Sequence, residues 1–383
     1  MSKKYFIKTY GCQANKSDAE RMAALFEEEG LIASDSWQDC DKLAVVTCSV
    51  RERAEQRVRA FLLKVAKFYQ DKKLTKPEII FSGCMIHHGQ EHLKKILPMI
   101  DQIVPTNQMA FLKKAKRQDK LHAFVPISVG CNSYCTYCIV PYARGREKSR
   151  PFSDIMEEVN GLVKEGYQEI TLIGQNVNSW GLEKIGVANR KMELHSALKR
   201  ESLPSNQSQY LTPSGTPPFV ELIRAISQFD EIKTLRFMSS NPWDFHDQLI
   251  EEIANNHKLD RFIHLPVQSG SDSVLYRMNR GYTREDYLNI IKKLRQAAPD
   301  VVLGTDIIVG FPGETEEEFA DTVDLAKKVN WHLAFVNIYS PRPGTSANQL
   351  YRDDVPYAIK KRRWQILDEL INKKNLKQRP KVV

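Results

Sequence analysis

The chain has 383 residues, of which 42% are hydrophobic and 27% are charged. A chain of this length buries substantial cores and is expected to divide into two or more domains. The amino terminus lacks the apolar segment of a signal peptide and no apolar run is long enough to cross a bilayer, so we expect a cytoplasmic protein without membrane contact. The net charge of +9 suits a polyanion such as RNA, although a solvated basic surface without a partner is equally compatible with it.

The first 120 residues alternate short apolar runs with amphipathic stretches, which is typical of βαβ units around an open parallel sheet. We predict strands and helices in the following ranges: strands at 5–9, 43–47 and 78–82, and helices at 17–29 and 52–69.

Cys12, Cys48 and Cys84 each follow the end of one of these predicted strands. Ligands collect beyond the carboxyl ends of parallel strands, so the three thiolates could meet and hold a metal cluster. The alternative is that they are small buried residues, but the shared placement, twice after a glycine, favours a site. Cys40 lacks this placement and is interpreted as an ordinary free thiol. Seven cysteines in a reducing compartment indicate metal binding or catalysis rather than disulfides.

Residues 130–138 read GCNSYCTYC and place Cys131, Cys135 and Cys138 in a C-x3-C-x2-C spacing. Three thiolates can bind one iron-sulfur cluster and leave one iron open for another ligand. Structural zinc is the alternative, but zinc takes four ligands and favours paired C-x2-C knuckles. An open iron can chelate the amine and carboxylate of S-adenosylmethionine, and radical chemistry from this pair of cofactors is well established.

From residue 121 to 350 the alternation of strands and helices resumes, which predicts a full or partial β/α barrel with reactive groups on its carboxyl-terminal face. The predicted ranges are strands at 124–129, 169–173, 233–238, 262–265, 301–309 and 332–339, and helices at 153–165, 245–255, 282–297 and 315–329. Segment 181–218 is polar and aperiodic and is interpreted as a surface insertion. The tail at 357–381 carries KKRR on a helical pattern that either contacts RNA phosphates or is solvated.

The cysteine loop GCNSYCTYCIVPYARG resembles that of the radical S-adenosylmethionine (SAM) methylthiotransferases. Further segments are similar to the MiaB branch of that family, the tRNA-2-methylthio-N6-dimethylallyladenosine synthases: YGCQANKSDAE, TCSVRE, SGC, LIGQNVNSW, HLPVQSGSD, DIIVGFPGET and YSPRPGT. The resemblance implies a methylthiotransferase domain at 1–120, a partial radical SAM barrel at 121–350 and a basic carboxyl-terminal helix at 351–383. The family usually adds a TRAM domain that grips tRNA, and we expect it to be absent here.

The resemblance also implies two [4Fe-4S] clusters, an auxiliary one on Cys12, Cys48 and Cys84 and a second on the 131–138 loop. One S-adenosylmethionine would methylate sulfur at the auxiliary cluster. Another would yield a 5′-deoxyadenosyl radical that removes hydrogen from C2 of N6-(dimethylallyl)adenosine at tRNA position 37, where methylthio is inserted. No general base is expected, because this aromatic C–H has no useful acidity near neutral pH.

The expected partners are the anticodon stem-loop of tRNA and an electron donor such as flavodoxin or ferredoxin, and the protein is expected to be a monomer. The source of the inserted sulfur stays open.

Seven residues are candidates for contacts to S-adenosylmethionine or substrate. Tyr137 lies between the last two loop cysteines, where an aromatic residue of the family packs on the adenine of the cofactor. The others fall at or near predicted strand ends facing the barrel mouth: Gln175, Asn176, Ser239, Ser240, Gln268 and Asp306. For any one of them, a turn-forming or locally satisfied role is an equal alternative.

Two other interpretations stay open. One is a methylthiotransferase acting on threonylcarbamoyladenosine in tRNA or on an aspartate of a ribosomal protein, and GCQAN and GQNVNSW favour the MiaB branch over it. The other is an iron-sulfur electron carrier or RNA-binding protein without transfer activity, which gives little reason to keep an open-iron loop.

Overall fold

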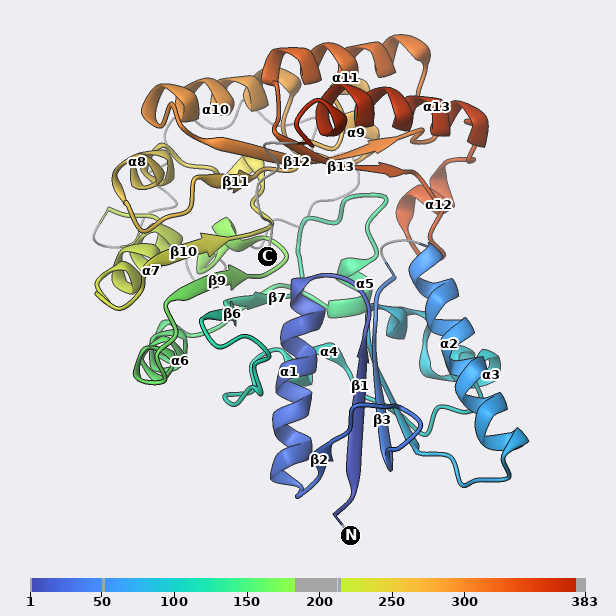
Figure 1. Ribbon diagram of the computed structural model, residues 1–383. Coiled ribbons are helices and arrows are strands. Elements are labelled where there is room, and N and C mark those ends of the chain that lie inside the picture. Colours follow the sequence, from blue (N-terminus) through green and yellow to red (C-terminus); the bar gives the residue numbers. More distant parts are fainter. Residues whose placement is uncertain (1, 50–51, 183–211, 213–214, 377–383) are drawn as a thin grey trace.

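The computed structural model describes residues 2–49, 52–182, 212 and 215–376. Two α/β units follow each other along the chain, a smaller parallel sheet flanked by helices and a larger arc of parallel strands (Figure 1). The predicted α/β class, with parallel strands in both units, is confirmed.

The N-terminal sheet has the strand order β2-β1-β3-β4-β5 and is parallel throughout. Its strands are β1 (Lys4–Thr9), β2 (Ile32–Ala33), β3 (Lys42–Thr47), β4 (Glu78–Gly83) and β5 (Gln102–Ile103). Successive side chains of a strand point to opposite faces, so β3 sends Leu43 and Val45 into one apolar layer and Ala44 and Val46 into the other. A strand buried on both faces is typical of parallel sheets.

Helices cover both faces of this sheet (Figure 1). α1 (Gln13–Glu28) and α4 (Thr106–Met109) lie on one face, and α2 (Glu52–Asp71) and α3 (Gln90–Ile96) on the other. A short 3-10 turn, η1 (Cys84–His88), leads from β4 to α3. The predicted helix at 17–29 begins earlier, at Gln13, directly after Cys12.

In its described residues, the second unit has six parallel strands in two ladders, β6-β9-β10 and β11-β12-β13. Their bounds are β6 (His122–Pro126), β9 (Glu169–Ile173), β10 (Thr234–Phe237), β11 (Phe262–His264), β12 (Val302–Val309) and β13 (Leu333–Ile338). A parallel bridge between Leu235 and Leu259 joins the ladders. Among the described strands β13 does not pair with β6, so the unit is an open, partial barrel.

The long helices of this unit cover the outside of the arc (Figure 1). They are α6 (Phe152–Lys164), α7 (Pro218–Ser227), α8 (Asp247–Asn255), α10 (Arg284–Ala297), α11 (Glu316–Val329) and α13 (Tyr357–Leu367). Shorter elements are β7 (Ser128–Val129), α5 (Val140–Arg144), β8 (Lys148–Ser149), η2 (Val177–Ser179), η6 (Pro242–Asp244), α9 (Asp272–Arg277), α12 (Ser346–Leu350) and the π-helix η7 (Asp368–Lys373). Thr283 and Thr315 begin α10 and α11 through capping boxes, which satisfy amides that a helix start leaves unpaired.

Two sequence-based predictions need correction in part, and a third falls largely outside the described residues. The strand expected at 124–129 divides after Pro126, where the chain turns so that β7 pairs antiparallel with β8. Segment 181–218 lies largely outside the described residues, but its last residue, Pro218, begins α7. The run KKRR is not solvated throughout, since Lys360 and Arg363 are buried and only Lys361 and Arg362 are exposed.

Both buried residues of that run have carboxylate partners. Lys360 Nζ pairs with Asp353, and Arg363 Nη1 lies 2.8 Å from Glu314 Oε2. An unpaired charge would be costly to bury there. These ion pairs therefore allow α13 to pack against the barrel.

A buried carboxylate joins the two units. Glu158 on α6 accepts hydrogen bonds from Arg21 on α1, at 2.8 Å, and from Arg117 and Arg150. Burial would raise the pKa of Glu158, but the three guanidinium groups lower it below its usual value. The carboxylate is therefore ionised and compensates several buried cations at the boundary between the units.

Replacing Glu158 by alanine tests this contact. We expect Glu158→Ala to lower the free energy of unfolding by about 3–5 kcal/mol, because it leaves buried guanidinium groups without a counter-charge. Urea denaturation measures the loss. The neighbouring Glu157→Ala removes an exposed pair with Lys113 and should cost less than about 1 kcal/mol. Equal losses in the two variants would contradict the importance of the buried contact.

Candidate active site

Cys12, Cys48 and Cys84 follow the carboxyl ends of β1, β3 and β4, which are neighbours in the sheet. Gly11 and Gly83, which precede Cys12 and Cys84, permit the strand ends to approach each other closely. A Cβ on Gly11, at φ +110, would lie 2.7 Å from Cys48 Cβ, and a Cβ on Gly83, at φ +95, would lie 2.2 Å from the carbonyl oxygen of Thr47. The structure thus brings the three cysteines to one edge of the sheet, as predicted.

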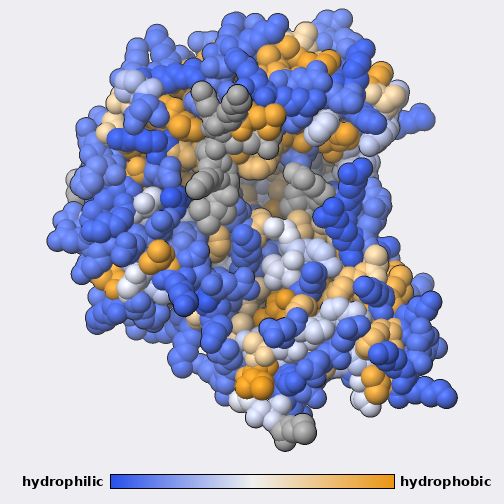
Figure 2. All heavy atoms as spheres, in the orientation of Figure 1, coloured by the Kyte–Doolittle hydropathy of each residue, from blue (hydrophilic) through white to orange (hydrophobic). Residues whose placement is uncertain are grey.

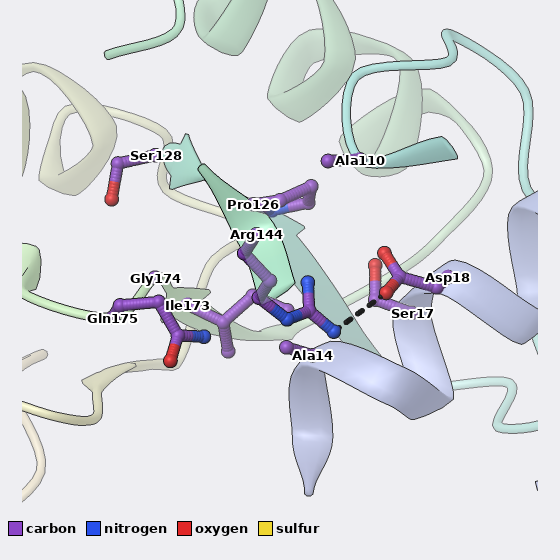
Figure 3. A pocket seen from close by; sticks show the side chains of 10 residues that line it. All are labelled: Ala14, Ser17, Asp18, Ala110, Pro126, Ser128, Arg144, Ile173, Gly174 and Gln175. Atoms are coloured by element: carbon purple, nitrogen blue, oxygen red, sulfur yellow. Dashed lines mark hydrogen bonds and ion pairs between the residues drawn. The ribbon is translucent and has the colours of Figure 1, made fainter. Parts of the chain in front are cut away.

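Arg144 connects this edge to the second unit. It lies at the end of α5, six residues after Cys138, and its Nη2 donates to Asn15 Oδ1 at 2.6 Å and to Asp18 Oδ2 at 2.8 Å. Figure 3 shows its guanidinium directed at Asp18 on α1, with Gln175 on the opposite side of the same pocket. Burial disfavours its charge, but Asp18, Cys84 and Cys12 raise the pKa of Arg144 above the ordinary value.

Asn15 holds the strand ends in place beside the cysteines. Its Nδ2 donates to the carbonyl oxygens of Tyr10, at 2.6 Å, and Thr47, at 2.9 Å. One fully buried side chain therefore links the ends of β1 and β3 to Arg144.

Cys131, Cys135 and Cys138 lie in the loop between β7 and α5, which the antiparallel β7–β8 pair frames. The loop is tied to the end of α9, because Thr136 N donates to the Met278 carbonyl at 3.0 Å. Arg280 is buried and its Nη1 lies 3.1 Å from Cys135 Sγ. A guanidinium at this distance favours negative charge on the sulfur.

Burial changes the acidity of three thiols, drawn from both sets. Burial raises the pKa of Cys131 to about 12, and it also raises the pKa of Cys138 and Cys84 above the ordinary value. Such thiols become thiolates only when a bound cation supplies the compensating charge. The donor chemistry of both sets therefore fits an iron-sulfur cluster.

The two cysteine sets border the same region between the units. α5, which follows Cys138, packs against η1, which begins with Cys84. The pocket beside Arg144 is lined by Asp18 from α1 and by Ser128 and Gln175 from the second unit. Figure 2 shows that the visible face of the molecule is hollowed between the two units.

The predicted residues after β9 and β10 include two with unsatisfied polar atoms. Gln175 and Asn176 follow β9, and Ser239 and Ser240 follow β10. Asn176 Oδ1 and Ser240 Oγ are buried without a hydrogen-bond partner within the described ranges. Buried polar atoms are almost always paired, so these two are suited to a bound molecule.

Two of the predicted residues have unusual backbone conformations. Ser239 has φ +67 and Gln268 has φ +72, in the left-handed region that residues other than glycine rarely adopt. Such a conformation costs about 1–3 kcal/mol, and strain of this kind clusters at functional sites. This strain supports the prediction of both residues.

Asp306 and Tyr137 lie where the sequence indicated only in part. Asp306 is inside β12 rather than at its end, and its Oδ2 lies 2.9 Å from His264 Nε2. Tyr137 is partly buried against an apolar cluster that includes Phe311 and Tyr339. Its ring contacts protein side chains, and packing on the adenine of S-adenosylmethionine stays a prediction.

Sequence reasoning assigned no role to five residues that the structure places at the site: Asn15, Asp18, Arg144, Arg280 and His264. Asn15 and Asp18 stand in the segment YGCQANKSDAE, where polar residues directly after a cysteine were a usable signal. Arg280 is 145 positions from Cys135, and nothing in the sequence links the two.

The chain matches two family models along its length. The model described as the radical SAM superfamily matches residues 125–326, and the model described as uncharacterized protein family UPF0004 matches residues 4–105. Among solved structures, the chain is similar to the radical S-adenosylmethionine methyltransferase TsrM from Kitasatospora setae, with a TM-score of 0.56, 14% identity and coverage of 91% of this chain and 77% of that one. The chain belongs to the radical SAM superfamily.

Two relatives define the family of this chain more narrowly. It is 37% identical over 398 residues to the tRNA-2-methylthio-N(6)-dimethylallyladenosine synthase of Thermotoga petrophila, covering 98% of this chain and 83% of that protein. It is 39% identical over 400 residues to that of Carboxydothermus hydrogenoformans, covering 97% and 83%. The chain belongs to the family of tRNA-2-methylthio-N(6)-dimethylallyladenosine synthases.

Family membership confirms the prediction of a radical SAM methylthiotransferase that uses S-adenosylmethionine and [4Fe-4S] clusters. Within the residues that the structure describes, no helix is long and apolar enough to cross a membrane.

The close approach of the strand ends predicts the effect of Gly83→Ala. The new Cβ would collide with the Thr47 backbone, so we expect a loss of stability beyond the about 1–2 kcal/mol of left-handed backbone strain, together with lower iron content. Thermal unfolding and iron analysis measure these effects. Gly166→Ala is the control, since Gly166 has φ +89 but open space around its Cβ position. Identical losses would show that crowding at the cysteines is unimportant.

Proposed function

We propose that this chain methylthiolates C2 of N6-(dimethylallyl)adenosine at position 37 of tRNA, forming 2-methylthio-N6-(dimethylallyl)adenosine. The observation that carries this proposal is the presence of two three-cysteine sets at the boundary of two parallel α/β units, with Arg144 between them. The substrate is taken from the names of relatives that are 37–39% identical over nearly the whole chain.

We assign Cys131, Cys135 and Cys138 to the cluster that binds S-adenosylmethionine, and Cys12, Cys48 and Cys84 to the auxiliary cluster. When bound, the cofactor supplies a carbon radical able to remove hydrogen from an aromatic C–H that no side-chain base could deprotonate. The protein's task is then to bind, to orient and to exclude water.

The side chains around the two sets have distinct tasks in this proposal. Arg280 stabilises thiolate charge at Cys135, and Arg144 does so at Cys84 and Cys12. Asn176, Ser239, Ser240 and Gln268 orient S-adenosylmethionine and substrate, which the unpaired atoms and strained backbone at these positions support. We also assign Gln175, Tyr137 and Asp306 to the walls of this site.

The boundary between the two catalytic domains is proposed near residue 120, with the barrel ending near residue 350. The proposed partners are the tRNA anticodon stem-loop, which suits a net charge of +9, and flavodoxin or ferredoxin as electron donor. The enzyme is proposed to act as a cytoplasmic monomer.

Nucleoside analysis tests the substrate. Anaerobically reconstituted and reduced protein is incubated with tRNA carrying either dimethylallyladenosine or threonylcarbamoyladenosine, and digested nucleosides are analysed by mass spectrometry. We expect a gain of methylthio only on the dimethylallyl substrate. Product only on threonylcarbamoyladenosine would overturn the choice of substrate.

The cluster assignment has its own measurement. We expect a variant with Cys131→Ala, Cys135→Ala and Cys138→Ala to keep about half of the wild-type iron and to yield no 5′-deoxyadenosine, because one of two clusters is lost. Iron and sulfide analysis with Mössbauer spectroscopy measures the clusters. Unchanged iron content would contradict the assignment.

A further inference from the structure

Beside the first cysteine set, three side chains of types that can bind a metal lie close together, and the proposed reaction does not use them. They are Glu55 near the start of α2 and His87 and His88 at the end of η1, and one ligand atom from each lies within 4.8 Å of the others. Glu55 is buried and the two histidines are partly buried. The group contains no cysteine, so it is separate from the cluster ligands.

His87 is oriented as a metal-binding imidazole. Its Nδ1 lies 2.8 Å from the carbonyl oxygen of Cys84, and a carbonyl only accepts, so Nδ1 carries the proton. Nε2 then presents a lone pair, yet it is buried and has no hydrogen-bond partner in the described part of the chain. A ring held by a backbone carbonyl through one nitrogen, with the other nitrogen free, is the usual arrangement of a histidine ligand.

Glu55 is oriented in the same way by outer contacts. Its Oε1 accepts from the hydroxyl of Ser49 and lies 3.9 Å from Arg342 Nη1. Its Oε2 lies 3.2 Å from His88 Nε2, facing the two imidazoles. One oxygen is therefore held by Ser49, and the other accepts from His88 Nε2 and becomes available to an ion once that imidazole gives up this hydrogen bond.

We propose that Glu55, His87 and His88 bind one divalent transition-metal ion, of the class of Zn²⁺ or Fe²⁺. Two imidazoles and one carboxylate are a ligand set of intermediate softness that suits these ions, whereas Ca²⁺ and Mg²⁺ prefer oxygen alone. Binding requires His88 to turn a lone pair toward the ion, which a shift of its neutral tautomer provides without net proton transfer. The remaining coordination positions are open to water or another small ligand.

The position of this site gives the ion a structural consequence. Glu55 is seven residues after Cys48, and His87 is three residues after Cys84. An ion bound by both segments ties α2 to η1 and thereby limits the separation of two thiols of the first set. The proposed ion site depends on the geometry of the three ligands and does not depend on the tRNA reaction.

Zinc binding to the cluster-loaded full-length protein tests the proposal. Equilibrium dialysis against Zn²⁺ under anaerobic conditions, followed by metal analysis, should show one zinc ion per chain that is lost in the variant with His87→Ala and His88→Ala, with affinity reduced at least about tenfold. X-ray absorption at the zinc edge should show nitrogen and oxygen neighbours and no sulfur. Zinc bound through sulfur, or equal binding by wild type and variant, would overturn the proposal.

Two further variants separate ligation from general damage. His92→Ala removes a neighbouring ring, 5.8 Å from that of His88, that lies outside the ligand group and should leave zinc affinity unchanged. Ser49→Ala keeps all three ligands but frees the carboxylate, and should weaken binding about 10–100-fold. Iron content and circular dichroism equal to wild type show that each variant is folded. Loss of zinc in His92→Ala together with full binding in Ser49→Ala would refute the ligand assignment.

Discussion

The arrangement of the site depends on the contacts that the buried guanidinium of Arg144 makes with the N-terminal unit. It belongs to the barrel unit, and its hydrogen-bond acceptors, Asn15 and Asp18, belong to α1 of the N-terminal unit. A charge buried in this way is tolerated only where its partners are in place, because an uncompensated buried charge costs several kcal/mol. The contacts of Arg144 therefore fix the position of the preceding cysteine loop relative to Cys12 and Cys84.

The boundary between the two units is charged where it is buried. Arg21 and Arg150 meet at Glu158 as Arg144 meets Asp18, and these side chains are nearly inaccessible to solvent. Apolar surfaces tolerate sliding, whereas buried ion pairs lose their compensation when the units shift. We infer that these contacts select one docking of the units and so one separation of the two cysteine sets. An ion bound by Glu55, His87 and His88, as proposed, would likewise limit the separation of thiols within the N-terminal unit.

Among the described residues, several buried polar atoms without hydrogen-bond partners follow the ends of strands. Asn176, Ser240 and His87 all have such atoms, and each follows a parallel strand of one of the two units. The carboxyl ends of parallel strands are where side chains from separate segments converge, which is why binding sites form there. Ser239 and Gln268, whose backbone is strained, also follow strands of the second unit, β10 and β11.

The sequence by itself determined the order of strands and helices, both cysteine sets and the family, because periodicity, glycine placement and close cysteine spacing are local signals. Only the tertiary structure decided that Arg144 reaches Cys84, that Arg280 reaches Cys135 and that Glu55 meets His87 and His88, since these partners are far apart in the chain or on different elements. It also decided that Lys360 and Arg363 are internal, although composition suggested a surface helix. The physical reason is that pairing of buried charges depends on how separate elements pack, and no local pattern encodes that packing.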